Sequence, residues 1–321
     1  MAHSRQFKRW LKFIIAIALG FGLITACSRT SQTSSTSPTE CRMIRHTRGE
    51  TCVPLNPQRV VILFDPAIAN ALALGIKPVG IAGSPGASGN ATIHYLQDEL
   101  TGVEFVGNQL QPSLEKILQL KPDLILGVVY QENYTQLSQI APTVMFEWEG
   151  TSYWRQHFQD VAEVFGKTAA AEQLMAKYAR RIAELKTALG SRRTLKISCA
   201  DYCCGGWRVD VKNSFIGSIL NDAGLQRPAA QDVEVEGGLL ELSEEHLSAM
   251  DGDILFISRL GDDEERTALN ELERKPLWTR LKAVQRKQVH LVDISIWRGS
   301  HILATDLVID DLFKYIVQKQ I

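Results

Sequence analysis

From Gln58 onward the chain alternates short β-branched apolar runs with segments whose apolar residues recur at helical spacing. The run RVVILF is typical of a buried strand, and the following DPAIANALALG is typical of a helix that ends at Gly75. The alternation continues through KPVGIAG, PSLEKILQL, KPDLILGVVY, ENYTQLSQI and APTVMFE. Repeated strand–helix–strand units predict a parallel sheet covered by helices, and hence a first α/β lobe over residues 41–151.

This rhythm stops between Ser152 and Leu189, where apolar residues recur at helical spacing and Gly166 is the one turn signal. We expect a single interlobe helix over residues 152–189, far longer than the average of about 11–12 residues, which Gly166 could divide. Strand and helix patterns then alternate again from TLKISCA to the terminal ATDLVIDDLFKYIVQ. The pattern therefore predicts an α/β protein with two Rossmann-like lobes, 41–151 and 190–321, connected by one long helix, with a ligand cleft between the lobes.

The N-terminal segment reads as an export signal. Basic residues precede an apolar run that is too short to cross a membrane comfortably, so residues 1–26 are expected to form a signal peptide. The run ends at LITAC, which resembles the bacterial lipobox, and Cys27 is the expected lipidation site. The alternative is an ordinary signal peptide with an incidental cysteine. Residues 27–40 are then a lipidated cysteine and a flexible Ser/Thr linker, which places the protein on the membrane through a lipid anchor, in the periplasm or on the outer face of the cell.

Composition excludes several classes of function. The net charge is −1 and no Lys/Arg stripe is present, so nucleic acid is not an expected partner. The motifs GxSxG, HExxH and the P-loop are absent, and the seven histidines are scattered along the chain. We therefore expect neither an enzyme, nor a cofactor, nor a metal bound directly by the protein.

Six cysteines are present, and exported cysteines tend to pair. Cys41 and Cys52 flank CRMIRHTRGETC, which reads as a hairpin turning at Thr47-Arg48-Gly49, so a disulfide between them is expected. Apart from Cys27, the remaining three cysteines lie in the stretch ISCADYCCGGWRVD, which we expect to form a cleft-facing loop. Its pattern leaves three readings open: a disulfide from Cys199 to Cys203 or Cys204, free buried thiols, or metal or redox chemistry.

Seven stretches, in order, resemble the periplasmic binding component of iron–siderophore ABC importers, a group that also contains vitamin B12 and haem binders. They are GETCVPLNPQRVVILFDPAIANALALGIKPVG, FVGNQLQPSLEKILQLKPDLILG, LSQIAPTV, the long helix, KNSFIGSILNDAGL, LSEEHL and PLWTRLKAVQRKQVHLVDISIWRG. The resemblance implies two lobes joined by one helix, with the ligand in the cleft. It also implies a monomer that delivers a ferric siderophore to a permease and its ATPase. A cobalamin- or haem-binding component is the alternative, with Tyr130 or Tyr202 available as a haem ligand.

Residues at strand ends are the candidates for binding the ligand. They are Phe64, Asp65, Ser84 and Tyr130 in the first lobe, and Trp207, Arg208, Arg259, Trp297 and Arg298 in the second. Arginine offers a forked set of donors for chelate oxygens, and the aromatic rings offer rigid contact area. Each arginine could instead be an ordinary surface residue, and Asp65 could only cap a helix. The mixture of arginine and tryptophan favours a hydroxamate or mixed citrate–hydroxamate siderophore.

Two glutamates match positions at which this family docks on its permease. The resemblance implies that Glu115 in PSLEKI and Glu245 in LSEEHL, one on each lobe, pair with permease arginines. Both lie near predicted helix starts, so each could instead stabilise a helix dipole, and Glu244 could replace Glu245 in either role.

Overall fold

The computed structural model describes residues 40–83, 93–130, 132–203, 205–259, 261 and 263–318. The signal peptide, Cys27, the Ser/Thr linker, Ser84 and Cys204 lie outside these residues. Residues Cys41–Ile321 form one compact unit. Within the described part of the chain, no helix combines the length and the apolar character that a membrane span requires.

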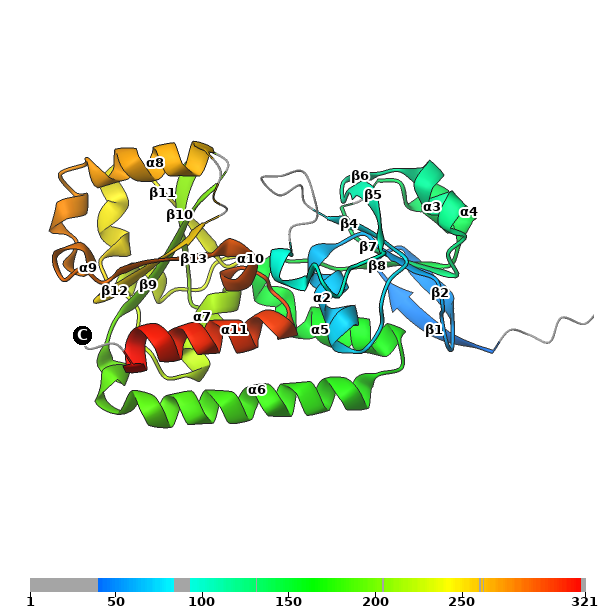
Figure 1. The fold of residues 1–321 in the computed structure, drawn as a ribbon, viewed down its shortest axis with the longest axis horizontal. Coiled ribbons are helices and arrows are strands. Elements are labelled where there is room, and N and C mark those ends of the chain that lie inside the picture. The colour runs from blue at the N-terminus through cyan, green and yellow to red at the C-terminus, as the bar shows by residue number, and fades with distance from the viewer. Residues whose placement is uncertain are drawn as a thin grey trace, which may run out of the picture. The chain divides into compact units, whose positions relative to one another are not determined.

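The first lobe is built on a six-stranded sheet of order β6-β5-β4-β3-β7-β8, parallel except for the β5–β6 pair (Figure 1). Its strands are β3 (Val60–Ile62), β4 (Gly80–Gly83), β5 (Glu104–Asn108), β6 (Gln111–Pro112), β7 (Leu124–Val128) and β8 (Thr143–Phe146). Its helical elements are α2 (Asp65–Ala73), η1 (His94–Leu96), α3 (Leu114–Leu120) and α4 (Tyr134–Ile140). The central strands are buried on both faces, which explains their continuous apolar sequences.

A disulfide-bonded hairpin precedes this sheet. Strands β1 (Cys41–His46) and β2 (Gly49–Pro54) pair antiparallel, and Cys41 is bonded to Cys52 with a Cα–Cα distance of 5.4 Å. The hairpin is held to β8, because Thr51 Oγ1 donates to Thr143 O at 2.9 Å and Thr47 Oγ1 donates to Met145 O at 2.9 Å. The sequence motif CRMIRHTRGETC therefore forms an attached, cross-linked ribbon.

The second lobe has a five-stranded sheet of order β11-β10-β9-β12-β13. Its strands are β9 (Ile197–Cys203), β10 (Gly206–Asp210), β11 (Leu239–Leu242), β12 (Ile254–Arg259) and β13 (Val289–Asp293). Its helical elements are α7 (Phe215–Asp222), η4 (Ala229–Gln231), η5 (Glu244–Met250), α8 (Asp263–Glu273), η6 (Trp278–Arg280), α9 (Lys282–Gln285), α10 (Ile294–Trp297), α11 (Ile302–Leu312) and η7 (Phe313–Gln318). Strands β9, β12 and β13 are parallel, whereas β10 and β11 run antiparallel to their neighbours. The α/β class with two sheets is confirmed, but the second sheet is mixed.

The predicted helix over residues 152–189 is two helices after a short turn, and its bounds are corrected here. The elements are η2 (Thr151–Tyr153), α5 (Trp154–Val164) and α6 (Thr168–Leu189), followed by η3 (Gly190–Thr194). Gly166 separates α5 from α6 in a left-handed conformation with φ of 63°, and its amide donates to Glu163 O at 3.0 Å. A residue with a side chain would be strained at this φ, and its Cβ atom would also displace the guanidinium of Arg42, so the backbone conformation is what favours glycine here.

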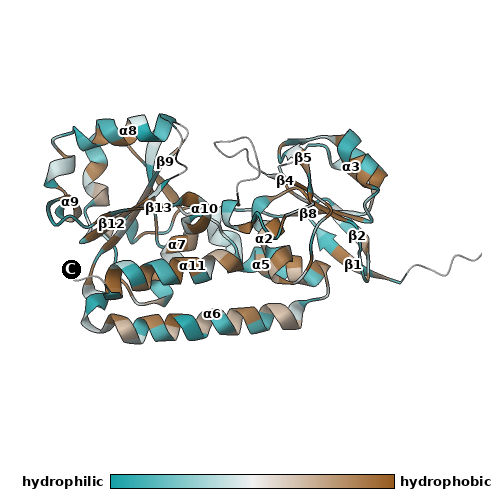
Figure 2. Cartoon of the chain, viewed as in Figure 1, coloured by the Kyte–Doolittle hydropathy of each residue, from teal (hydrophilic) through white to brown (hydrophobic). Residues whose placement is uncertain are grey.

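One apolar cluster runs through both lobes. It includes Trp154 and Phe158 of α5, Phe256 of β12 and Trp297 of α10, all fully buried. Figure 2 colours the strands of both sheets largely brown and α8 largely teal, as expected for strands inside and a solvent-facing helix outside.

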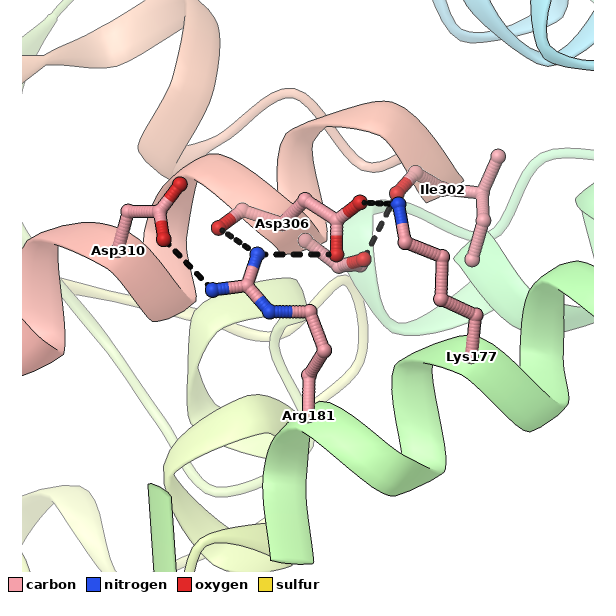
Figure 3. Close-up of polar contacts among 6 residues, drawn as sticks. Lys177, Arg181, Ile302, Asp306 and Asp310 are labelled. Carbon is pink, nitrogen blue, oxygen red and sulfur yellow. Dashed lines mark hydrogen bonds and ion pairs between the residues drawn. The ribbon is translucent and has the colours of Figure 1, made fainter. Parts of the chain in front are cut away.

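Ion pairs connect α6 to α11 (Figure 3). Lys177 Nζ lies 2.5 Å from Asp306 Oδ2, and Arg181 contacts both Asp306 Oδ1 at 3.2 Å and Asp310 Oδ1 at 2.6 Å. The C-terminal helix is thereby joined to the helix that connects the two sheets.

Candidate binding pocket

A pocket of about 550 Å³ lies where the carboxyl ends of strands from both sheets meet. The first lobe contributes residues that follow β3, β5 and β8, together with η1. The second lobe contributes the ends of β12 and β13 and the residues that follow them, including α10, which lies on the side of its sheet toward α2 (Figure 1). The lining residues are Phe64, Asp65, Pro66, Ile93, His94, Gln109, Trp148, Thr151, Arg259, Gly261, Leu291–Ser295 and Arg298–His301.

The first-lobe wall is aromatic. The ring of Phe64 meets Trp148 edge to face with centroids 4.8 Å apart, and it meets Tyr130 at 6.4 Å. Behind these rings lies His157, which is fully buried and 5.4 Å from both Phe64 and Trp148, ring to ring. Neither ring nitrogen of His157 has a hydrogen-bond partner among the described residues, and burial lowers the pKa of this histidine to about 3. His157 therefore stays neutral and acts as another packed ring.

The second-lobe wall is polar and carries two arginines. Arg298 follows α10, and its Nη1 donates to Asp201 Oδ2 at 2.8 Å. Arg259 ends β12, and its Nε donates to the buried Glu265 Oε1 at 3.3 Å. A guanidinium has five N–H donors, so each arginine has more donors than these contacts use. The wall can therefore offer forked, charged donors to acceptor oxygens of a ligand.

Polar contacts join the two lobes at the floor of the pocket. His301 caps the start of α11, where its Nδ1 accepts from Ala304 N at 3.2 Å. Because Nδ1 is an acceptor, the neutral ring carries its proton on Nε2 and donates to Tyr95 Oη, 2.7 Å away. Burial lowers the pKa of His301 to about 3, and the nearby His157 acts in the same direction. Asn70 Oδ1, from α2, accepts from Ile302 N at 3.2 Å.

Four of the candidate binding residues come together in this pocket: Phe64, Asp65, Arg259 and Arg298. Tyr130 is 42% exposed and touches the back of Phe64 without lining the pocket. Five further residues line the pocket but were not singled out from the sequence: His94, Gln109, Trp148, Asp293 and His301.

Three other candidates do not line the pocket. Trp297 is fully buried and its Nε1 donates to Asp311 Oδ2 at 2.8 Å, because neighbouring residues of the short α10 point in different directions. Trp207 lines a separate cavity of about 310 Å³ with Tyr202. Arg208 is the next residue of β10 and so faces the other side of the sheet, where it pairs with Asp201.

The cysteine-rich stretch is a strand pair, which corrects the expected loop. Cys199 lies in the middle of β9, is 2% exposed, and is a free thiol. Cys199 and Cys203 are four residues apart on one extended strand, about 13 Å between Cα atoms, which is too far for a disulfide between these two. The other pairing considered, from Cys199 to Cys204, lies outside the described residues. Burial also raises the pKa of the Cys199 thiol, which makes it unreactive.

The two candidate docking glutamates are exposed. Glu115 lies in the first turn of α3, which Ser113 caps, and its Oε1 accepts from Gln119 Nε2 at 3.2 Å. Glu245 lies in η5, and its Oε2 accepts from Ser243 Oγ at 3.2 Å.

No cluster of three or more His, Cys, Asp or Glu side chains capable of holding a metal ion exists in the described part of the chain. A pocket with one aromatic and one arginine-bearing wall, between two α/β lobes, is typical of a protein that binds a small molecule.

Comparison with known proteins agrees with this class. A sequence model described as "Periplasmic binding protein" matches residues 62–294. The chain is 31% identical to the probable siderophore-binding lipoprotein YfiY of Bacillus subtilis, over 97% of this chain and 99% of that protein. It is 30% identical to the Fe(3+)-citrate-binding protein YfmC of the same species, over 92% and 94%. Staphylococcus aureus SirA complexed with staphyloferrin B is similar in structure, with a TM-score of 0.74, 28% identity, and coverage of 87% of this chain and all of that one.

The chain belongs to the periplasmic binding protein family. This is a family of binding proteins, so the chain is not an enzyme.

Proposed function

We propose that this protein captures a ferric siderophore outside the cytoplasm and delivers it to the permease of an ABC importer. The observation that carries the proposal is the interlobe pocket, in which Phe64 and Trp148 face a wall bearing Arg259 and Arg298. Three similar proteins support this ligand class. YfiY is a probable siderophore-binding lipoprotein, YfmC binds Fe(3+)-citrate, and SirA was solved with staphyloferrin B.

The two arginines favour a chelate that carries carboxylates. Arginine binds carboxylate oxygens through paired, charge-assisted hydrogen bonds, whereas a neutral hydroxamate chelate gains less from it. Aromatic rings on the opposite wall suit the flat or apolar parts of such a molecule. We therefore favour a citrate-containing siderophore over a purely hydroxamate one.

Haem is less well supported as a ligand. Tyr130 and Tyr202, the two tyrosines considered as haem ligands, both lie outside the lining of the pocket. Cobalamin stays an alternative that the binding test below includes.

The proposed route of delivery begins at the membrane. Lipidation of Cys27 would anchor the protein, and the Ser/Thr linker would give the folded unit, acting as a monomer, reach toward its permease. Glu115 and Glu245 would then meet arginines of the permease, and the ATPase would drive import.

The experiment is a titration of tryptophan fluorescence, with the full chain in detergent. Ferric citrate, a neutral ferric hydroxamate, a ferric catecholate, haem and cobalamin are added in turn. We expect saturable quenching by ferric citrate or a citrate-containing chelate, and a smaller signal in the Trp148→Phe variant, because Trp148 is the tryptophan that lines the pocket. Saturable binding of haem or cobalamin, without any ferric chelate, would contradict the proposed function.

A further inference from the structure

A buried cluster of charge lies behind the arginine wall of the pocket. Arg298 lines the pocket, with 14% of its side chain exposed, and its Nη1 donates to Asp201 Oδ2. Arg208 Nη2 donates to the same oxygen, and the side chain of Asp201 is fully buried. One carboxylate oxygen therefore holds two guanidinium groups, of which only Arg298 reaches the pocket.

Three elements bring these groups together. Arg208 stands directly opposite Asp201 in the β9–β10 ladder, so strand pairing itself aligns the two side chains. On its other side β9 pairs with β12, where Asp201 is opposite Ser258. Arg298 arrives from the segment after β13 and α10. The sheet therefore builds the pair of Arg208 and Asp201, and Arg298 joins it from the end of α10.

Asp201 does not line the pocket, and its hydrogen bond with Arg298 connects it to a residue that does. A buried arginine without a partner is costly, and its guanidinium would move to find water. The bond from Arg298 Nη1 to a fixed carboxylate holds the guanidinium, and therefore its other N–H donors, in one position. A ligand that binds these donors then loses less free energy to ordering the side chain. Arg298 Nε has no hydrogen-bond partner among the described residues, so the bond from Nη1 to Asp201 is what holds this guanidinium in place.

We propose that Asp201 is a positioning residue, which fixes the guanidinium of Arg298 to receive a carboxylate of the bound ferric chelate. This inference rests on the proposed function and adds to it a residue that never touches the ligand.

A second carboxylate, that of Asp210, belongs to the same charged cluster and affects its net charge. Asp210, at the end of β10, is 3% exposed and faces Arg298, Asp201 and Arg208, with Ser214 beside it. Asp210 also lies near the thiol of Cys199 on β9, and Arg227 lies near the same thiol. Burial raises the pKa of Asp210 to about 7; Asp201 adds to the rise, while Arg298 opposes it.

The cluster should therefore change charge near neutral pH. Above the pKa of Asp210, two carboxylates balance Arg208 and Arg298. Below it, Asp210 is protonated and the cluster has one more positive charge beside the pocket. An anionic chelate should then bind more tightly as the pH falls through about 7.

The test measures the dissociation constant of ferric citrate by fluorescence, with the full chain in detergent, between about pH 5.5 and pH 8.5. Each variant is compared with the parent at every pH, which removes the pH dependence of the chelate itself. We expect Asp201→Asn to weaken binding about tenfold. We also expect the midpoint of the pH dependence to move to lower pH, because the negative charge that helps raise the pKa of Asp210 is gone.

The matched control is Asp222→Asn. Asp222 also bonds an arginine, Arg155, with Oδ2 at 2.6 Å from its Nη2, but it lies away from the pocket. This variant should keep both the parent affinity and the parent midpoint.

If Asp201→Asn does not fold, the double variant Asp201→Asn/Arg208→Gln removes one charge of each sign and keeps the cluster balanced. It should show the same loss of affinity. Affinities of the folded variants within about twofold of the parent, with the midpoint unchanged, would overturn the inference. A parent protein that binds a neutral ferric hydroxamate but not ferric citrate would overturn it while leaving the proposed function standing, and a parent that binds no ferric chelate would overturn both.

Discussion

At the scale of single residues, His157 shows how a polar side chain can serve as an aromatic one. Its ring lies 4.9 Å from Phe146 and 5.4 Å from Phe64 and Trp148, and both nitrogens lack partners among the described residues. The unfolded chain would protonate it near its ordinary pKa of 6.5, whereas the folded chain holds it neutral down to about pH 3. Between these values the unfolded state binds the extra proton.

The sign of the pH dependence follows. The stability that comes from neutral His157 is complete above about pH 6.5 and is lost as the pH falls toward 3. We predict that His157→Phe reduces the fall of unfolding free energy in this window by up to about 1.4 kcal/mol per pH unit, the value for one proton. Urea unfolding at several pH values measures it, with His94→Gln as the exposed control. An unchanged slope in His157→Phe would contradict the prediction.

Much of the pocket could be predicted from residues at strand ends, but not all of it. Phe64 could be predicted because it ends the apolar strand run RVVILF, and Arg298 because it lies shortly after the strand pattern VHLVDIS. Trp297 precedes Arg298 in the same pattern, and no periodicity in a four-residue helix tells which of the two faces the ligand. Trp148 and His301 reach the pocket through irregular turns and a helix cap, which depend on tertiary packing.

At the scale of elements, ion pairs connect helix α6 to helix α11 (Figure 3). Arg181 bonds Asp306 and Asp310 of α11 with 22% of its side chain exposed, so it is better shielded from water than an ordinary surface pair. We predict that Arg181→Met lowers the free energy of unfolding by about 1–2 kcal/mol.

The measurement is urea unfolding with and without added salt. Arg180→Met is the matched control, because Arg180 is the preceding residue of α6 and is exposed. High salt should shrink the effect of Arg181→Met, since it screens the ion pairs that the parent keeps. A loss that is equal for both variants would mean that helix propensity, and not the ion pairs, is responsible.

The same elements show the limits of periodicity. Apolar spacing through residues 152–189 correctly indicated helix, but spacing alone could not show that Gly166 adopts a left-handed φ and ends α5. Likewise, the pattern of ISCADYCCGGWRVD was read as strand then loop, whereas the backbone turns back at Gly205–Gly206 and forms β10. Turns of this kind depend on the φ value of a glycine. Glycine adopts positive and negative φ about equally, so its presence in the sequence does not show which one is taken.

At the scale of the whole molecule, the proposed capture site and the proposed docking residues lie on different surfaces. The pocket lies between the sheets, whereas Glu115 and Glu245 are exposed on α3 and η5, one in each lobe, and neither lines the pocket. A substitution at either glutamate should therefore leave the ligand contacts intact. What it should change is the encounter with a permease that presents arginines, because complementary charge speeds and orients docking.

We predict that Glu115→Ala/Glu245→Ala keeps the dissociation constant for the ferric chelate but lowers its uptake about tenfold in cells that carry the cognate permease. The control is Glu172→Ala/Glu184→Ala, which removes two exposed glutamates of α6 and should leave uptake unchanged. Equal uptake by the two double variants would assign Glu115 and Glu245 to helix stabilisation alone. A weakened affinity in the first double variant would instead mean that the docking surface and the pocket are coupled through the lobes.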